Sequence, residues 1–365
     1  MAEENPYKQN PDLDFEDVDE LGEEAARDQA ALLRDALEHH DYRYYVEASP
    51  VISDKAYDKL FRRLQDLEEA FPELQRPDSP TQRVGAEPLD SLERVEHVTT
   101  MLSLDAAFED EEIASFDDFV RRNLDGDEAH YVCEPKFDGM SIEIIYEDGV
   151  FSRAATRGNG REGEDVTENV RTIRSVPLHL RDDADIPSLL AVRGEIYMPI
   201  SGFQEMNKAR IERGDDAFAN PRNAAAGAVR LLDPMTVASR PLEAYFYDIL
   251  AIEGMSFDSH WEALQTFPKW GLRTDEHTTR AETLEEVHAF RNKLGEQRDD
   301  LDYEIDGVVI KIDDFDQRER LGVRSRSPRW AIAWKYEPQK EVTTLQDIAV
   351  QVGRTGKLTP VAMLK

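Results

Sequence analysis

The stretch CEPKFDGMS, from Cys133 to Ser141, sets one cation between two carboxylates just before a glycine turn. Lys136 lies two residues after Glu134 and two before Asp138, and Gly139 follows. If the stretch is extended, Glu134 and Lys136 point to the same side of a strand, because side chains alternate along β-structure. Two interpretations stay open on this stretch alone: an ordinary solvated strand end, or a lysine placed to react.

Short alternating runs continue from about residue 95 onward, with Gly turns and helical stretches at 203–213 and 283–296 between them. They predict an α+β domain with largely antiparallel sheets. Three further runs each put a charged residue on a strand face that is otherwise small or apolar. They contain Arg193, Glu195 and Tyr197; Gly307, Val309 and Lys311; and Ala331, Ala333 and Lys335. A half-exposed sheet explains any one run, but four in one chain weaken that explanation.

A lysine amine is a nucleophile only when neutral, and its reference pKa of about 10.4 makes the neutral form rare at pH 7. Lowering a lysine pKa to about 7 costs roughly 4–5 kcal/mol, which desolvation and nearby cations can supply. Lys311 and Lys335 are the candidate neighbours of Lys136, and they would also neutralise an attacked phosphate. The carboxylates nearby would hold a hydrated Mg²⁺ or orient the ligand.

Residues from about 20 to 75 are predicted to be helical. A first helix is indicated by apolar residues around Leu33 and Leu37, and a second is expected after Ser53, a favourable N-cap. The apolar stripe of the second helix is Tyr57, Leu60, Phe61, Leu64, Leu67 and Phe71. RPDSPTQRVGAEP, rich in proline and turn formers, is then a natural linker.

The formal net charge of −33 normally argues against binding nucleic acid, because the phosphate backbone requires cations. Acidic residues occur in helices and loops alike, which favours adaptation to a cytosol of very high salt over a single polyanion-repelling segment. Residues 1–19 are expected to form an acidic, disordered tail without a signal core. The one cysteine, Cys133, excludes a disulfide framework and a four-thiolate zinc site, and no apolar run is long enough for a membrane span. We therefore expect a cytoplasmic monomer that binds no zinc within this chain and does not associate with a membrane.

Four motifs occur in the order found in the covalent nucleotidyltransferases, and the chain resembles that class. They are Lys-x-Asp-Gly at 136–139, RGE at 193–195, DGVVIK at 306–311 and WAIAWKY at 330–336. Four longer stretches are similar to the bacterial-type NAD-dependent DNA ligases: YRYYVEASPVISDKAYDKL, ATRGNGREGEDVTENVRTI, FANPRNAAAGAVRLLDP and QVGRTGKLTPVA. The resemblance covers nearly everything after about residue 20. It implies a helical domain that binds nicotinamide mononucleotide (NMN) at 20–90, a nucleotidyltransferase (adenylation) domain at 91–337, and the start of an OB-fold β-barrel at 338–365.

The resemblance also implies the chemistry. Lys136 would attack the α-phosphorus of NAD, expel NMN and become lysyl-AMP, and the AMP would then pass to the 5′-phosphate of nicked double-stranded DNA. Glu134 is similar to the residue that reads the adenine amino group, and Ser103 and Leu104 match backbone contacts to the nucleotide. Positions that match contacts around the ribose, phosphates or metal are Arg157, Glu195, Arg222, Arg298, Lys311 and Lys335.

Further matches concern metal and DNA. Asp138 and Asp306 match essential carboxylates, and Asp138 and Glu195 would reach Mg²⁺ (or Mn²⁺) through water. Arg230 matches a basic residue that faces DNA phosphate, and Arg222 could form a basic patch with it. Two ordinary surface arginines on a helix remain the alternative.

The front segment contains the positions that match contacts to NMN: Tyr44, Tyr45, Asp54, Tyr57 and Asp58. Asp54, Tyr57 and Asp58 share one helix face at i, i+3 and i+4. A structural role is also open, because two acids near a helix N-terminus offset its dipole and Tyr57 belongs to the apolar stripe. Tyr45 stands where many family members carry histidine; it can stack and donate a hydrogen bond, but it cannot be cationic.

Other functions give different expectations. GNGREG at 158–163 satisfies the G-x-G-x-x-G pattern of hydride-transferring dehydrogenases, but the candidate acid, Asp183, lies in a loop-like stretch and no run of βαβ units follows. NAD is therefore expected as an adenylate donor. An ATP-dependent ligase or capping-type enzyme shares the Lys136 motif set, and a non-catalytic nucleic-acid clamp is a third class. The chain ends inside the expected OB fold, so we expect a fragment that is competent in adenylation and seals nicks poorly.

Overall fold

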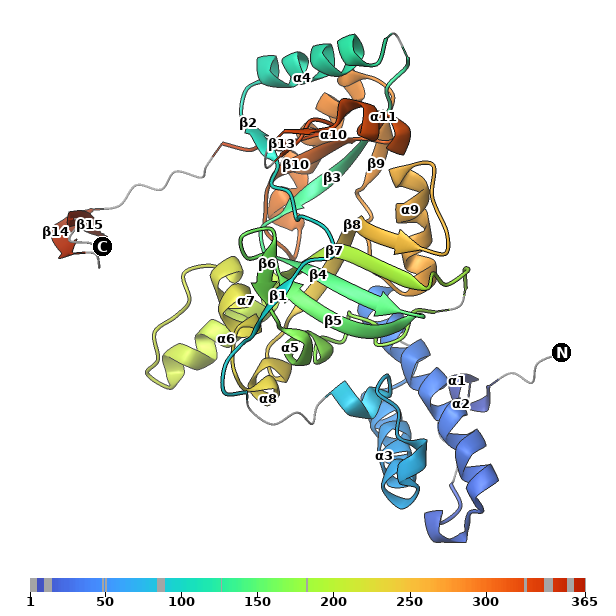
Figure 1. The fold of residues 1–365 in the computed structure, drawn as a ribbon. Helices are drawn as coiled ribbons and strands as arrows, with labels where there is room; N and C mark the ends of the chain where they lie inside the picture. The colour runs from blue at the N-terminus through green and yellow to red at the C-terminus, as the bar shows by residue number, and fades with distance from the viewer. Residues whose placement is uncertain are drawn as a thin grey trace. The chain divides into compact units, whose positions relative to one another are not determined.

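The computed structural model describes residues 5–9, 15–47, 49, 51–83, 89–125, 127–181, 183–324, 327–337, 344–352 and 358–364. The chain divides into two compact units, Met1–Lys335 and Tyr336–Lys365. In the first unit a helical front segment is followed by a body with two main sheets (Figure 1). The predicted α+β class with largely antiparallel sheets is confirmed.

The front segment is a pair of amphipathic helices, α2 (Glu23–Asp41) and α3 (Asp54–Ala70), whose apolar stripes face each other. Leu33 and Leu37 of α2 and Leu60 of α3 are completely buried in their common core, as the helical periodicity predicts. Ser53 caps α3, its side chain accepting a hydrogen bond from the Ala56 amide. Short turns complete this part: α1 (Pro6–Gln9), η1 (Val18–Glu20), the π-helical η2 (Tyr42–Val46), η3 (Pro72–Leu74) and η4 (Pro80–Arg83).

The described part of residues 1–19 differs from the disordered tail that the sequence predicts. Tyr7 is 7% exposed and packs in the helical core, and Phe15 and Val18 lie against the same core. The Tyr7 and Phe15 rings contact each other, with centroids 5.8 Å apart. Isolated aromatic residues thus attach this acidic stretch to the helix pair, although its composition alone indicates disorder.

The first sheet of the body has five strands in the order β2-β13-β10-β3-β9. The strands are β2 (Asp105–Ala107), β13 (Ala331–Lys335), β10 (Ile305–Ile312), β3 (Tyr131–Phe137) and β9 (Thr279–Ala281). The second sheet is antiparallel, in the order β5-β4-β7-β8. Its strands are β5 (Val150–Thr156), β4 (Met140–Glu147), β7 (Leu189–Tyr197) and β8 (Glu243–Glu253). In the first sheet β13 and β2 pair in parallel and the other pairs are antiparallel.

The second sheet supports the main hydrophobic core. Ile144 of β4 and Val192 of β7 are completely buried there, together with Ala225 and Val229 of α7 (Pro221–Val229). Asn220 caps α7 and Pro221 occupies its first turn, a favourable start for a helix. The remaining helices are α4 (Asp110–Asn123), α5 (Thr167–Arg171), α6 (Ile200–Glu212), α8 (Pro234–Ala238), α9 (His260–Thr266), η5 (Phe267–Trp270), α10 (Leu284–Gln297), η6 (Arg298–Asp300) and α11 (Phe315–Leu321). Among the described helices none is long and apolar enough to cross a membrane.

Asp138 and Gly139 carry the chain from the first sheet to the second, since β3 ends at Phe137 and β4 begins at Met140. A Cβ on Gly139 would lie 2.4 Å from the carbonyl oxygen of Ile196 and 2.9 Å from the Cγ of Glu195. Only glycine therefore allows this approach of the turn to β7. Lys136 consequently stands at the end of one sheet where the chain crosses to the other.

The G-x-G-x-x-G stretch does not open a helix. It forms the turn between β5 and β6 (Glu162–Glu164), with positive φ at Gly158 and Gly160, and β6 pairs with β1 (Arg94–Glu96). Asp183 is exposed and forms an ion pair with Arg181. These observations confirm that a hydride-transfer dinucleotide fold is absent from this stretch.

Two small antiparallel pairs remain. One joins β11 (Val323–Arg324) and β12 (Ser327–Pro328) in the first unit. The other joins β14 (Leu345–Val352) and β15 (Leu358–Leu364) and forms the second unit. The predicted OB fold at 338–365 stays a prediction.

Candidate active site

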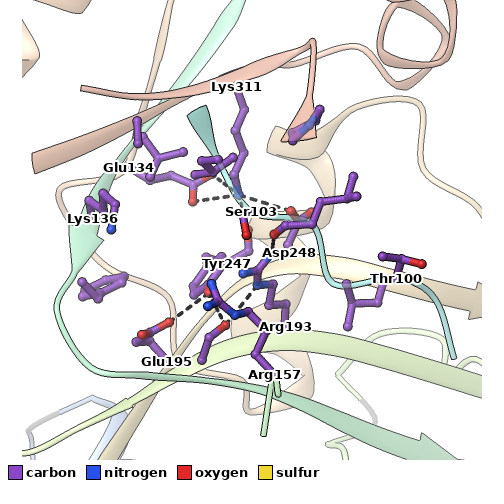
Figure 2. Close-up of a pocket in the computed structure, with 18 of the residues that line it drawn as sticks. Thr100, Ser103, Glu134, Lys136, Arg157, Arg193, Glu195, Tyr247, Asp248 and Lys311 are labelled. Atoms are coloured by element: carbon purple, nitrogen blue, oxygen red, sulfur yellow. Dashed lines mark hydrogen bonds and ion pairs between the residues drawn. The ribbon is translucent and has the colours of Figure 1, made fainter. Parts of the chain in front are cut away.

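A cavity of about 900 Å³ lies at this crossing and is lined by residues of both main sheets (Figure 2). The structure brings to its walls many of the residues that the sequence singled out. These are Ser103, Leu104, Glu134, Lys136, Arg157, Glu195, Arg222, Arg230, Lys311 and Lys335. Segments far apart in the chain thus contribute to a single concave surface, as ligand sites commonly require.

Lys136 forms an ion pair with Asp306, 2.9 Å from Nζ to Oδ1, and Lys335 forms a second with Oδ2 of the same carboxylate, also at 2.9 Å. The strand register explains this arrangement, because Lys136 of β3 and Lys335 of β13 both pair with Gly307 of β10. Burial raises the pKa of Asp306, but the ammonium groups of Lys136 and Lys335 outweigh it, and the net shift is downward. Asp306 is therefore a carboxylate held between two cations.

The expectation that Lys311 is a close neighbour of Lys136 stays a prediction: both line the cavity, but their strand positions differ. Lys311 pairs with Val132 and Ala331, four residues further along β10 than Gly307, which is a backbone separation of roughly 14 Å at about 3.4 Å per residue. The shared face predicted for Gly307 and Lys311 does not by itself bring Lys311 to the nucleophile. In the described structure the charged neighbour of Lys136 within ion-pair distance is a carboxylate.

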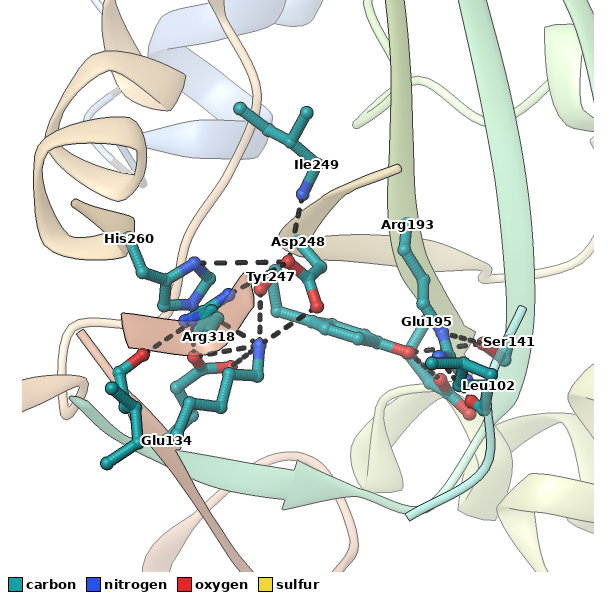
Figure 3. Close-up of polar contacts among 12 residues, drawn as sticks. Leu102, Glu134, Ser141, Arg193, Glu195, Tyr247, Asp248, Ile249, His260 and Arg318 are labelled. Atoms are coloured by element: carbon teal, nitrogen blue, oxygen red, sulfur yellow. Dashed lines mark hydrogen bonds and ion pairs between the residues drawn. The ribbon is translucent and has the colours of Figure 1, made fainter. Parts of the chain in front are cut away.

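Lys311 belongs to a buried polar cluster with Glu134, and Figure 3 labels the other members, Asp248, His260 and Arg318, near Glu134. Lys311 Nζ donates to Glu134 Oε2 at 3.0 Å and to the Tyr247 carbonyl oxygen at 2.7 Å, and lies 3.6 Å from Asp248 Oδ2. His260 Nε2 lies 2.6 Å from Glu134 Oε1. We call the set Glu134, Asp248, His260, Lys311 and Arg318 the buried cluster.

Burial controls the protonation of this cluster. It raises the pKa of Glu134, although Lys311 and Arg318 act in the opposite direction. Burial lowers the pKa of His260 well below its usual range, and Lys311 and Arg318 lower it further, so the imidazole is neutral. For Asp248 burial raises the pKa, but the cations around it outweigh burial and the net shift is downward.

Glu195 lies on the β7 side of the cavity. Its Oε2 accepts a hydrogen bond from the Tyr247 hydroxyl at 3.0 Å. Burial raises the pKa of Glu195 to about 7, against the opposing effects of Arg193, the Tyr247 hydrogen bond and Lys136. The neighbouring Arg193 donates to Ser141 Oγ and to the Leu102 carbonyl oxygen, so it ties β7 to β4 and to the loop that carries Ser103.

The two arginines expected to face DNA are both paired with carboxylates. Arg222 Nη1 lies 2.5 Å from Asp138 Oδ1, and Arg230 Nε lies 2.7 Å from Glu164 Oε2. Both line the cavity from α7 and its C-cap, with more than half of each side chain exposed. Their charge is thus partly compensated in this state.

Comparison with known families decides the class. The family described as NAD-dependent DNA ligase adenylation domain matches residues 89–339, and the one described as DNA ligase-like, N-terminal NAD+-binding domain matches residues 23–85. The chain belongs to the NAD-dependent DNA ligase adenylation domain family. The second match favours NAD over the ATP-dependent alternative.

Relatives of this adenylation domain are named DNA ligase. The protein from Haloarcula marismortui is 56% identical over 360 residues, covering 99% of the chain and 51% of that protein. The one from Haloferax volcanii is 56% identical over 363 residues, covering 100% and 51%, and the one from Salinibacter ruber is 51% identical over 356 residues, covering 97% and 51%. The chain spans about half the length of these relatives. Their sources fit the high-salt adaptation that the net charge predicts.

Several residues that the sequence predicts for the site are not among those that line the cavity. Arg298 lies in η6, where its positive charge opposes the rise in the pKa of Glu304 that burial causes. Tyr44 and Asp58 are exposed on η2 and α3, and Tyr57 lies beneath the Arg174 guanidinium, 5.6 Å from carbon to ring centroid. The side chains of Tyr45 and Asp54 lie outside the described part. The role of the front segment stays a prediction.

Sequence reasoning missed Tyr247, Asp248, His260 and Arg318. Tyr247 and Asp248 are adjacent in the run YFYDIL of β8 and both line the cavity, and the pairing of β7 with β8 shifts register at this point, so alternation does not predict the pair. His260 and Arg318 come from the short helices α9 and α11. No local pattern indicates that these two helices meet the buried cluster.

Proposed function

We propose that this chain transfers AMP from NAD to Lys136 and releases NMN. The observation that carries the proposal is the position of Lys136 Nζ, which lines the cavity beside one carboxylate, with Lys335 on the other side of it. In the reaction the Nζ lone pair forms a bond to the α-phosphorus while the bond from that phosphorus to the bridging oxygen breaks. NMN leaves with the bridging oxygen, and Asp306 is placed to accept the proton that Nζ loses.

The remaining wall residues support binding of the adenylate. Glu134 and Lys136 share one face of β3, so a base near Glu134 leaves the phosphate near Lys136. Lys335 would balance charge on the phosphates. Ser103, Leu104 and Arg157 line the same cavity and would contact the nucleotide.

We further propose Mg²⁺ as the metal. In the described part of the chain no group of three or more His, Cys, Asp or Glu side chains is arranged to hold an ion. Mg²⁺ keeps several waters and commonly takes only one or two carboxylates together with substrate phosphates, so this finding is compatible with it. Glu195 and Asp138 would be those carboxylates, and the ion would neutralise charge on the phosphates of NAD.

The whole-enzyme function follows from the relatives' name, and it is part of the proposal. AMP would pass from Lys136 to the 5′-phosphate of a nick in double-stranded DNA, with Arg222 and Arg230 contacting DNA after exchanging their carboxylate partners for phosphates. Tyr44, Tyr45, Asp54, Tyr57 and Asp58 would contact NMN. The segments 20–90, 91–337 and 338–365 would be the NMN-binding, adenylation and beginning OB-fold domains.

Intact-mass measurement tests the first step. The protein is incubated with NAD and Mg²⁺, and we expect a gain of one AMP that is absent from Lys136→Ala. The same gain from ATP would establish the ATP-dependent alternative. No gain from either nucleotide would overturn the proposal.

A further inference from the structure

The buried cluster contains a histidine that the proposed reaction does not use. We infer that His260 is a positioning residue that holds the Glu134 carboxylate as a hydrogen-bond acceptor toward the base of the nucleotide, and so makes the site select a 6-amino purine over a 6-oxo purine. The inference rests on the proposed function, because it assumes that the adenylate occupies this cavity.

The Glu134 carboxylate is held by the buried cluster on one side and faces the cavity on the other. It is 3% exposed and lines the cavity, with His260 Nε2 at 2.6 Å from Oε1 and Lys311 Nζ at 3.0 Å from Oε2 (Figure 3). A carboxylate has about four lone-pair sites, so acceptor capacity remains on the cavity side. Val309, Ala333 and the Tyr247 ring line the same cavity and suit a flat heterocycle.

The position of His260 selects one tautomer. The imidazole is neutral, so only one of its nitrogens carries a proton. With Glu134 ionised, a proton on Nδ1 would set the Nε2 lone pair against Oε1 at 2.6 Å, and Nδ1 has no hydrogen-bond partner among the described residues, with Asp248 3.9 Å away. Lys311 Nζ also lies 3.3 Å from Nε2, but its shorter contacts are to Glu134 and to the Tyr247 carbonyl oxygen. The proton therefore lies on Nε2 and is donated to Glu134. The His260 amide donates to the Asp313 carbonyl oxygen at 2.8 Å, which fixes the ring's origin at the start of α9.

A hydrogen bond donated by His260 favours the ionised form of Glu134, which only accepts, and so opposes the effect of burial. An ionised carboxylate accepts from an exocyclic amino group but faces an unfavourable contact with a carbonyl oxygen. Without the His260 donor, burial favours the protonated acid, although Lys311, Arg318 and Asp248 still surround it. A protonated Glu134 can donate to a 6-oxo group. Removal of His260 should therefore relax the selection, because a polar site discriminates through the groups it leaves unpaired.

The test compares NAD with nicotinamide hypoxanthine dinucleotide as donors to Lys136. Initial rates of AMP and IMP addition are measured by intact mass over a range of donor concentrations, for the wild type, His260→Leu and His260→Gln. We expect the AMP-to-IMP ratio of kcat/KM to fall roughly 10- to 100-fold in His260→Leu and to be largely restored in His260→Gln, which keeps an N–H donor. His277→Leu is the matched control, because His277 also contacts a carboxylate, Asp275, at 3.1 Å but does not line the cavity.

The outcomes separate this inference from the proposed function. A wild type that gains no AMP from NAD overturns both. A wild type that gains AMP, together with a folded His260→Leu whose ratio is unchanged, overturns the role of His260 alone. If His260→Leu does not fold, His260→Asn replaces it, since its shorter amide does not reach Glu134, and an unchanged ratio in that variant has the same meaning.

Discussion

Two charged regions lie at different points along β10, the central strand of the first sheet, and are built for different tasks. Around Gly307, the set Lys136, Asp306 and Lys335 has side chains that are 24–35% exposed. The side chains of Lys311, four residues further along β10, and of Glu134 on the neighbouring β3 are each 3% exposed. Charges near solvent can exchange partners cheaply, whereas buried charges hold theirs because separation is costly. We call Lys136, Asp306 and Lys335 the exposed set, because they are more exposed than the buried cluster. The exposed set suits bond making and breaking, and the buried cluster suits recognition by fixed groups.

The largest expected effect is on chemistry in the exposed set. Asp306→Asn removes the acceptor placed beside Lys136, and a positioned general base commonly contributes about 10²–10⁴-fold. We expect the rate of AMP addition to fall by that order, while the free energy of unfolding changes by less than about 1 kcal/mol. Single-turnover mass measurements and thermal unfolding check the two parts.

Asp306→Glu is the matched control for this prediction and should retain part of the rate. A rate that is unchanged or increased in Asp306→Asn would contradict the role of the carboxylate. It would show instead that the proximity of two ammonium groups governs the reactivity of Lys136.

The second effect is on stability in the buried cluster. Lys311→Met leaves Glu134 and Asp248 without their shared cation, and removing one partner of a buried pair costs about 3–5 kcal/mol. We expect a clearly lower denaturation midpoint in urea. Lys335→Met, the matched change in the exposed set, should cost less than about 1 kcal/mol. Equal losses in the two variants would erase the distinction between the regions.

The strands of the first sheet show which features of the site could be predicted from the sequence. Alternation predicted that Glu134 and Lys136 share a face, and likewise Gly307 with Lys311 and Ala333 with Lys335; the apolar stripe predicted α3. It did not predict the bridge at Asp306, because that requires the register of three strands from distant parts of the chain. His260 and Arg318 depend on where α9 and α11 pack, which no local period encodes. Tyr7 and Phe15 were missed because isolated aromatics in an acidic stretch have no period.

A third effect concerns pH, at Glu195. Burial raises its pKa to about 7, so between about pH 4.5 and 7 the folded state binds more protons than the unfolded state. The contribution of Glu195 to stability is therefore present at low pH and is lost as the pH rises through 7. We expect Glu195→Gln to lose less of its melting temperature than the wild type between pH 5 and 8.

Glu38 provides the control for the pH prediction, since burial also raises its pKa to about 7 but it lies on α2 and does not line the cavity. Glu38→Gln should flatten the pH dependence similarly without affecting AMP addition. Parallel melting curves for Glu195→Gln and the wild type would show that Glu195 is ionised throughout this range.

The smallest expected effect on stability and on AMP addition is at Arg230, which lies outside both regions. Its ion pair with Glu164 joins side chains that are 51% and 38% exposed. Such pairs contribute about 0–1 kcal/mol, so Arg230→Gln should leave both the melting temperature and AMP addition to Lys136 nearly unchanged. If Arg230 serves DNA, the variant should instead weaken binding to a nicked duplex and reduce the salt dependence of that binding by about one unit of slope. A loss of AMP addition comparable to that of Asp306→Asn would place Arg230 in the adenylation step. The distinction between exposed ion pairs that take part in adenylation and exposed ion pairs that serve only DNA binding would then be lost.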